Sequence, residues 1–129
     1  ARLLAERLGL RPDQWVITFQ SRFGKAPWLQ PYTEPTLIEL GRSGVGRVDV
    51  ACPGFVSDCI ETLEEIAIEG KQAFLGAGGT DFHYIPCLND QHEWIAALSA
   101  VAEQHLAGWP TRDTSDGAAL ERQRERARS

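Results

Sequence analysis

Apolar residues recur along the chain at helical spacing in four segments. Leu3, Leu4 and Leu8 form the first set, and Gly9 is placed to end that helix. Thr33 is placed to cap a second helix with Pro35 in its first turn. Helices are therefore expected over about residues 1–8, 33–41, 58–75 and 90–107.

Short runs of β-branched and aromatic residues between these helices predict strands. The runs are Trp15–Phe19, Arg47–Cys52 and Asp81–Pro86. Strands that alternate with helices usually pair in parallel through right-handed crossovers. We therefore expect an α/β fold, a three-layer sandwich with a mainly parallel sheet.

Two polar segments follow the first two expected strands. Gln20 and Ser21 come directly after the first strand, and the stretch from Pro53 to Glu61 comes after the second. Ligands of parallel sheets bind outside the carboxyl ends of the strands. Side chains of the two segments are therefore expected to converge on one crevice.

Four acidic residues lie on one side of the helix that follows Pro53. At about 100° per residue, Asp58, Glu61, Glu65 and Glu69 fall within an arc of about 80°. Like charges four residues apart repel by roughly 0.2–0.5 kcal/mol per pair, and a cation would offset that cost. The repulsion should also raise the pKa of at least one of these acids. The alternative is a solvated acidic face, and Asp58 with Glu61 also fits a capping box.

Composition and charge narrow the class of protein. A chain of 129 residues with 43% apolar and 24% charged residues is long enough for one compact domain. Its net charge of -5 argues against a nucleic-acid partner, and no apolar run approaches the ~20 residues that span a bilayer. Cys52, Cys59 and Cys87 have the spacing of neither a zinc site nor a disulfide scaffold, and they suit a reducing cytoplasm.

Two motifs resemble the C-terminal half of ferrochelatase, the enzyme that inserts ferrous iron into a porphyrin. The first is the loop QSRFGKAPWLQPYT at residues 20–33, and the second combines Pro53-Gly54-Phe55 with Ser57-Asp58-x-Ile60-Glu61-Thr62-Leu63. The resemblance covers about residues 1 to 106, in the same order and spacing. It implies one Rossmann-like chelatase half-domain, protoporphyrin IX as substrate and the last step of haem biosynthesis. It also implies a π-turn that aligns the acidic side chains.

The resemblance assigns roles to individual residues. Glu61 matches the pocket glutamate beside the porphyrin, where a carboxylate can accept the two pyrrole protons that metal insertion displaces. The remaining matches are the porphyrin-binding positions Ser21, Trp28 and Phe55, and the metal-handling acids Asp58, Glu65 and Glu69 alongside Glu61.

The chain departs from the common family pattern at one residue and lacks two features found in family members. Cys59 stands where many ferrochelatases have histidine after the aspartate. The family's pocket histidine precedes the region present here, and His83, His92 and His105 do not match it. Some ferrochelatases bind an iron–sulfur cluster through cysteines of a C-terminal extension. Residues 110–129 contain no cysteine, so we expect no iron–sulfur cluster and no permanently bound cofactor.

We interpret the chain as a fragment, because Ala1 begins within a helix and no initiator methionine precedes it. Residues 1–109 are expected to form the C-terminal ferrochelatase-like domain, and residues 110–129 a polar, flexible tail. The expected partners are porphyrin, ferrous iron and the N-terminal half of the same protein, without which the fragment should be inactive. Two alternatives stay open: a chelatase that inserts cobalt or nickel into a related tetrapyrrole, and a non-catalytic tetrapyrrole- or cation-binding module. Peripheral membrane association and oligomeric state are also open.

Overall fold

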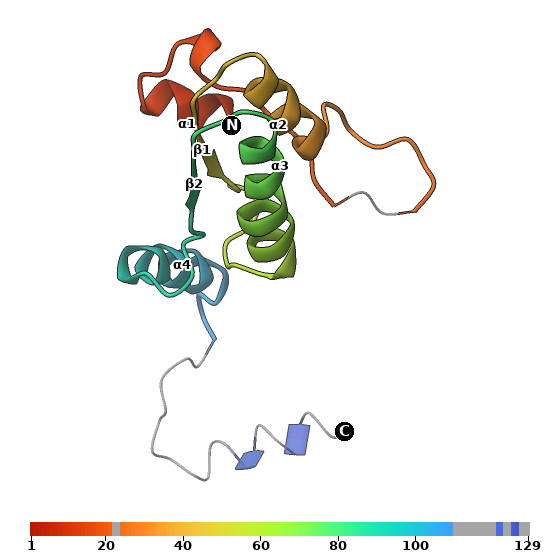
Figure 1. Cartoon of the computed structure of the whole chain (residues 1–129). Helices are drawn as coiled ribbons and strands as arrows, with labels where there is room; N and C mark the ends of the chain where they lie inside the picture. Colours follow the sequence, from red (N-terminus) through yellow and green to blue (C-terminus); the bar gives the residue numbers. More distant parts are fainter. Residues whose placement is uncertain (22–23, 110–120, 123–124, 127–129) are drawn as a thin grey trace. The chain divides into compact units, whose positions relative to one another are not determined.

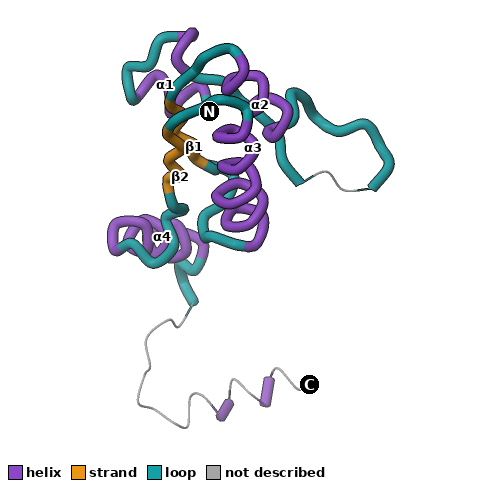
Figure 2. Tube along the Cα trace, in the orientation of Figure 1, coloured by secondary structure: helices purple, strands orange, loops and turns teal. Residues whose placement is uncertain are grey.

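The computed structural model describes residues 1–21, 24–109, 121–122 and 125–126. They divide into two compact units, Ala1–Asp90 and Gln91–Ser129. Most of the predicted tail lies outside the described residues. The second unit contains α4 (His92–His105). The elements of the first unit, drawn in Figures 1 and 2, are α1 (Arg2–Arg7), the 3-10 turn η1 (Pro12–Gln14), α2 (Thr33–Arg42), β1 (Arg47–Ala51), the π-helix η2 (Glu61–Gly70), α3 (Lys71–Gly76) and β2 (Asp81–Ile85).

The sheet of the first unit pairs β1 with β2 in parallel, in a register that runs from Arg47 opposite Asp81 to Ala51 opposite Ile85. Alternate residues of each strand are exposed, so the strands have one packed and one open face. The chain segment between the strands contains η2 and α3, as a parallel crossover requires. The predicted α/β class with parallel pairing is confirmed, and the third layer of the sandwich stays a prediction.

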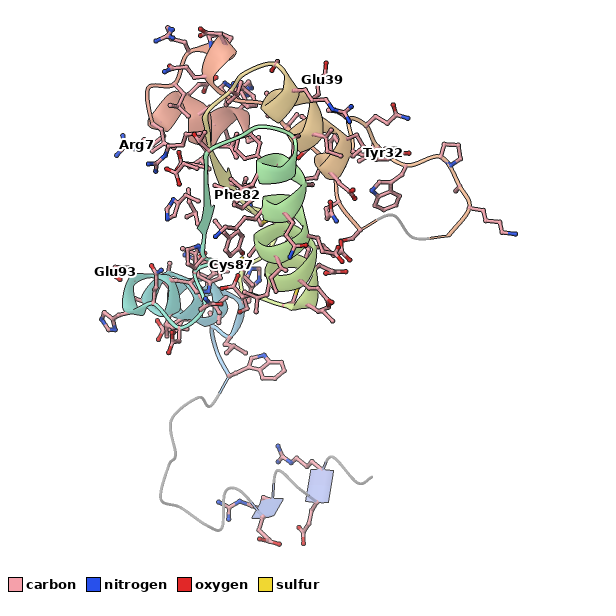
Figure 3. The ribbon with its side chains drawn as sticks, viewed as in Figure 1. Arg7, Tyr32, Glu39, Phe82, Cys87 and Glu93 are labelled. Atoms are coloured by element: carbon pink, nitrogen blue, oxygen red, sulfur yellow. The ribbon has the colours of Figure 1, made fainter. Side chains whose placement is uncertain are left out.

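The core lies between this sheet and three helical segments. One side chain from each of α2, η2, α3 and β2 forms it: Leu37, Ile66, Phe74 and Phe82. The Phe74 ring is fully buried and lies 6.2 Å from the Phe82 ring, centroid to centroid. Phe82 points from β2 toward the helical layer (Figure 3). A Cβ on Gly79 would overlap the Phe74 ring, so only glycine fits at that position.

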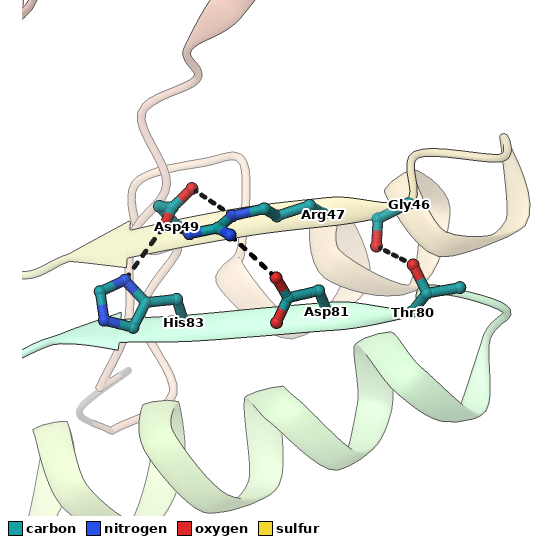
Figure 4. A network of polar contacts seen from close by, with 6 residues as sticks. All are labelled: Gly46, Arg47, Asp49, Thr80, Asp81 and His83. Atoms are coloured by element: carbon teal, nitrogen blue, oxygen red, sulfur yellow. Dashed lines mark hydrogen bonds and ion pairs between the residues drawn. The ribbon is translucent and has the colours of Figure 1, made fainter.

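The open face of the sheet carries a ladder of charged side chains (Figure 4). Arg47 lies between two carboxylates, with its Nη1 3.0 Å from Asp81 Oδ2 and its Nη2 2.9 Å from Asp49 Oδ1. The hydrogen bond from Arg47 is the main reason that the pKa of Asp49 lies below its usual range. His83 Nδ1 is 3.0 Å from Asp49 Oδ1. These exposed pairs add little free energy. Two of them, Arg47 with Asp81 and Asp49 with His83, join residues that face one another in the register.

The predicted strand Trp15–Phe19 is wrong. Within this run only Phe19 makes a β-bridge, to Tyr32. The Phe19 N–H donates to Pro31 O at 2.9 Å, and the Thr33 N–H donates to Phe19 O at 3.2 Å. Strand-forming residues need a hydrogen-bonding neighbour along their whole length, and this run meets the loop at one residue only. Thr33 also begins α2 instead of capping it, and its hydroxyl donates to Thr18 Oγ1 at 3.0 Å.

Candidate functional site

The acidic segment that follows β1 folds as a π-helix, which confirms the predicted π-turn and extends it to the ten residues Glu61–Gly70. A π-helix is closed by i→i+5 hydrogen bonds, so it turns less per residue than an α-helix. Every fourth residue is buried against the core, namely Thr62, Ile66 and Gly70. The three glutamates that each precede one of them therefore form a parallel row along the helix: Glu61, Glu65 and Glu69.

Glu65 connects this row to the loop that follows Phe19. The Gln20 side-chain amide donates to Glu65 Oε2, and Ser21 Oγ lies 3.5 Å from the same oxygen. The indole Nε1 of Trp28 donates to the Gln20 carbonyl oxygen at 3.2 Å. These contacts join the first polar segment to Glu65, which follows the second segment Pro53–Glu61, so the convergence of the two segments themselves stays a prediction. Glu65 thus carries an anchoring role that its sequence position did not indicate.

A hollow of about 290 Å³ opens beside this anchor. Its lining comes from residues 19–21 on one side and residues 32–35, at the start of α2, on the other. Tyr32 marks this place in Figure 3. Ser21, a predicted porphyrin-binding residue, lines the hollow with a positive φ of 58°. The other two predicted porphyrin-binding residues lie elsewhere: Trp28 is exposed in the loop, and Phe55 is half-buried after β1.

Several side chains donate hydrogen bonds to the Asp58 carboxylate. Its Oδ1 accepts from Tyr84 OH at 2.6 Å and from Thr62 Oγ1 at 3.1 Å, and its Oδ2 accepts from Asn89 Nδ2 at 2.7 Å. The hydrogen bonds from Asn89 and Tyr84 hold the pKa of Asp58 well below its usual range, against the desolvation that would raise it. This direction is opposite to the one that repulsion among the acids would give.

The predicted capping box of Asp58 with Glu61 does not form. The Asp58 N–H donates to Asn89 Oδ1 at 2.8 Å, and the Cys59 N–H donates to Thr62 Oγ1 at 3.0 Å. The Asp58 carboxylate is bound by the side chains described above, so it is not available to cap the helix.

Glu61 begins the π-helix and is half-exposed. Its described partner is the Cys59 thiol, whose Sγ lies 3.4 Å from Glu61 Oε2. A thiol is a weak donor, so this carboxylate can exchange protons with a ligand beside it. Within the described part of the chain, no three side chains of His, Cys, Asp or Glu gather as a metal site would require. The metal-handling roles of Asp58, Glu61, Glu65 and Glu69 therefore stay predictions.

The three cysteines carry free thiols. Burial raises the pKa of Cys52 to about 11 and also raises the pKa of Cys87. Cys87 is buried beyond the end of β2, with its Sγ 3.6 Å from Tyr84 OH. Metal binding and nucleophilic attack both need the thiolate, so Cys52 and Cys87 are poorly suited to either at neutral pH.

Sequence reasoning missed three residues that hold the acidic segment in place. The loop motif contains Gln20 but does not indicate its hydrogen bond to Glu65, and no sequence pattern points to Tyr84 or Asn89. Asn89 has a φ of 49°, a left-handed conformation that asparagine adopts more readily than most residues. Its place between Leu88 and Asp90 in the sequence gives no indication of its contact with Asp58.

Comparisons with known proteins show which family the chain resembles. Residues 1–106 match the family described as Ferrochelatase. The chain is 68% identical over 128 residues to a ferrochelatase of Methylibium petroleiphilum, covering 99% of this chain and 35% of the relative. It is 62% identical over 127 residues to a ferrochelatase of Polaromonas sp., which covers 98% of this chain and 35% of that relative. It is 66% identical over 120 residues to a ferrochelatase of Dechloromonas aromatica, which covers 93% of this chain and 33% of that relative. The chain thus spans about a third of the length of the curated relatives it matches.

Proposed function

The chain belongs to the ferrochelatase family, and from this membership we propose that the full-length protein inserts ferrous iron into protoporphyrin IX to form haem. In this proposal the chain is the C-terminal domain and forms one wall of the porphyrin cleft. The N-terminal half of the same protein supplies the opposite wall. The activity is that of a lyase in haem biosynthesis, and we place it in the cytoplasm.

The observation that best supports this proposal is the π-helix with its row of glutamates beside the loop that carries Ser21 and Trp28. Insertion of a divalent ion releases two protons from the pyrrole nitrogens, so the charge balance requires a base near the macrocycle. Glu61 is the base in this account, because its carboxylate is half-exposed and its described contact is the weak one with Cys59. It accepts one proton at a time and returns each to water.

In this proposal the other predicted residues bind the porphyrin or guide the metal ion. Ser21, Trp28 and Phe55 contact the porphyrin, while Glu65 and Glu69 draw the hydrated metal ion along the helix. Iron is a substrate here, and the domain holds no permanent cofactor and no iron–sulfur cluster. Among the described helices none is long and apolar enough to cross a membrane.

The test is metal insertion by the full-length protein under anaerobic conditions. Protoporphyrin IX and a related tetrapyrrole are each offered with iron, cobalt, nickel or zinc, and the product is followed by its absorbance. Turnover of iron at a rate well above the non-enzymatic one is the expected result. A protein that turns over cobalt or nickel with another tetrapyrrole, and ignores iron, would be the related chelatase. A protein that binds porphyrin tightly without turnover would be a binding module.

The 129-residue chain by itself should bind porphyrin weakly and show no turnover. A single wall cannot hold the macrocycle in the geometry that proton removal needs. The measurement repeats the insertion assay on this chain, then adds the separately expressed remainder of the protein. Robust turnover by the chain alone would show that its site is complete and would contradict the two-walled cleft.

A further inference from the structure

We propose that Asn89 and Tyr84 are positioning residues that fix Glu61 by holding Asp58. The inference rests on the proposed function for its catalytic consequence, and on the contacts of the first unit for its structural part. In this proposal Asp58 holds the first turn of the π-helix in position. The two residues come from β2 and the segment after it, which are distant in sequence from the π-helix.

Asn89 binds Asp58 through both ends of its side-chain amide. Its Nδ2 donates to Asp58 Oδ2 at 2.7 Å, while its Oδ1 accepts from the Asp58 N–H at 2.8 Å. The Asn89 N–H also donates to Val56 O at 3.0 Å. Three hydrogen bonds therefore tie one residue to the loop that leads into the π-helix. This pattern defines both the side-chain rotamer and the backbone position of Asp58.

Tyr84 and Thr62 complete the connection to the helix. Tyr84 OH and Thr62 Oγ1 both donate to Asp58 Oδ1, at 2.6 Å and 3.1 Å. Thr62 is fully buried, and its own N–H donates to Cys59 O at 3.2 Å in the first turn. Glu61 is the neighbour of Thr62 in that turn, so its backbone is held by the same network. A shift of about 1 Å at a reacting group can cost about a hundredfold in rate, which is why such a network matters.

The direction of these hydrogen bonds allows a sharp experiment. Asn89→Asp alone places two carboxylates face to face, and Asp58→Asn alone leaves two amide groups with mismatched donors. The double exchange Asp58→Asn with Asn89→Asp restores every one of these hydrogen bonds with the charge moved to position 89. The amide oxygen introduced at position 58 can still accept from Tyr84 and Thr62, because an amide oxygen has two lone pairs.

The experiment measures kcat and the porphyrin KM of the full-length protein, together with amide hydrogen exchange of Thr62 and Leu63. Each single variant should lower kcat about tenfold or more with KM nearly unchanged, and should speed exchange in the first turn. The double variant should recover kcat to within about threefold of wild type and restore the exchange protection. Tyr84→Phe, which keeps the ring and loses one donor, should lower kcat about threefold. Asp90→Asn, next to the network and exposed, is the matched control and should behave as wild type.

Two results would overturn the inference. A double variant as slow as the single variants would show that the charge of Asp58 itself is needed, as in a direct role toward the metal ion. Single variants with wild-type exchange at Thr62 and Leu63 would show that the contact between Asn89 and Asp58 does not fix the turn. If the wild-type protein inserts no metal, the proposed function fails, and the exchange rates alone still decide whether Asn89 positions this turn.

Discussion

The side chains of Gln20 and Glu65, 45 residues apart in the sequence, are joined by a hydrogen bond from the amide to the carboxylate. One partner lies in the loop with Ser21 and Trp28, and the other in the middle of the π-helix. The loop that we assign to the porphyrin wall is therefore attached to the helix that we assign to proton and metal handling. The acidic row therefore has a structural role, in addition to its proposed role in proton and metal handling.

Gln20→Ala should loosen this attachment. The loop would lose its anchor while the chemistry at Glu61 is left intact, so the porphyrin KM should rise by about threefold to tenfold with a smaller change in kcat. Steady-state kinetics of the full-length protein with a varied porphyrin concentration measures both constants. Gln72→Ala, which removes the same side chain from the exposed surface of α3, is the control. An unchanged KM in Gln20→Ala would mean that the loop needs no anchor.

The elements of the first unit could largely be predicted from the sequence, because local patterns determine them. The β-branched run that contains Val48 and Val50 predicts β1, and Gly9, which has a positive φ, follows α1 as predicted. The run Trp15–Phe19 has equally good strand composition but pairs at Phe19 only. Strand propensity describes the fit to a neighbouring strand, and no local pattern reveals whether that neighbour is there.

The site was less predictable, for two physical reasons. Hydrophobic periodicity assumes the α-helical repeat, so the π-helix followed only from the family resemblance. The partners of Asp58 are brought to it by the parallel pairing of β1 and β2, and Asn89 is 31 residues away in the sequence. Spacing alone therefore placed Asp58 in the acidic row and could not show that its oxygens are already bound.

The contribution of the acidic row to metal delivery can be tested at Glu69. This residue is exposed at the end of the row, and the described contacts of the row to the loop involve Glu65 instead. Glu69→Gln should raise the metal concentration needed for half-maximal rate by about threefold, since one carboxylate for a hard cation is lost. The double change of Glu65 and Glu69 to Gln should raise it further and also raise the porphyrin KM.

The control for that series is Glu64→Gln, an exposed glutamate of the same helix that lies outside the row. It should leave the metal dependence unchanged. If Glu69→Gln behaves in the same way as Glu64→Gln, the row is a solvated acidic face and takes no part in metal delivery.

Gly79→Ala should destabilise the fold. The new methyl group would overlap the Phe74 ring, which is fully buried. Overpacking of this kind costs about 1–3 kcal/mol, so the unfolding midpoint of the 129-residue chain in urea should fall clearly. Gly54→Ala, where a Cβ would meet no atom within 4 Å, should leave the midpoint nearly unchanged. Equal midpoints for the two variants would contradict the packing of Phe74 against Gly79.

Cys52 should resist alkylation at neutral pH. Its pKa is raised by burial from 9.0 to about 11, so its thiolate fraction at pH 8 is about a hundredfold below that of an unperturbed thiol. Iodoacetamide labelling followed by peptide mass spectrometry should show slow modification of Cys52 at pH 8. The rate should rise steeply toward pH 11, and unfolding in urea should remove the protection. Fast labelling of folded protein at pH 8 would contradict the burial of this thiol.

Glu61, the first residue of the π-helix, is the group that accepts protons from the porphyrin in the proposed function. The most direct measurement is the rate of iron insertion by the full-length Glu61→Gln protein, with Glu64→Gln as its control and thermal unfolding measured in parallel. Glutamine keeps the size of the side chain and removes its basicity, so we predict a fall in kcat of about a hundredfold or more at an unfolding temperature close to wild type. Near-normal turnover by Glu61→Gln at neutral pH would contradict the account.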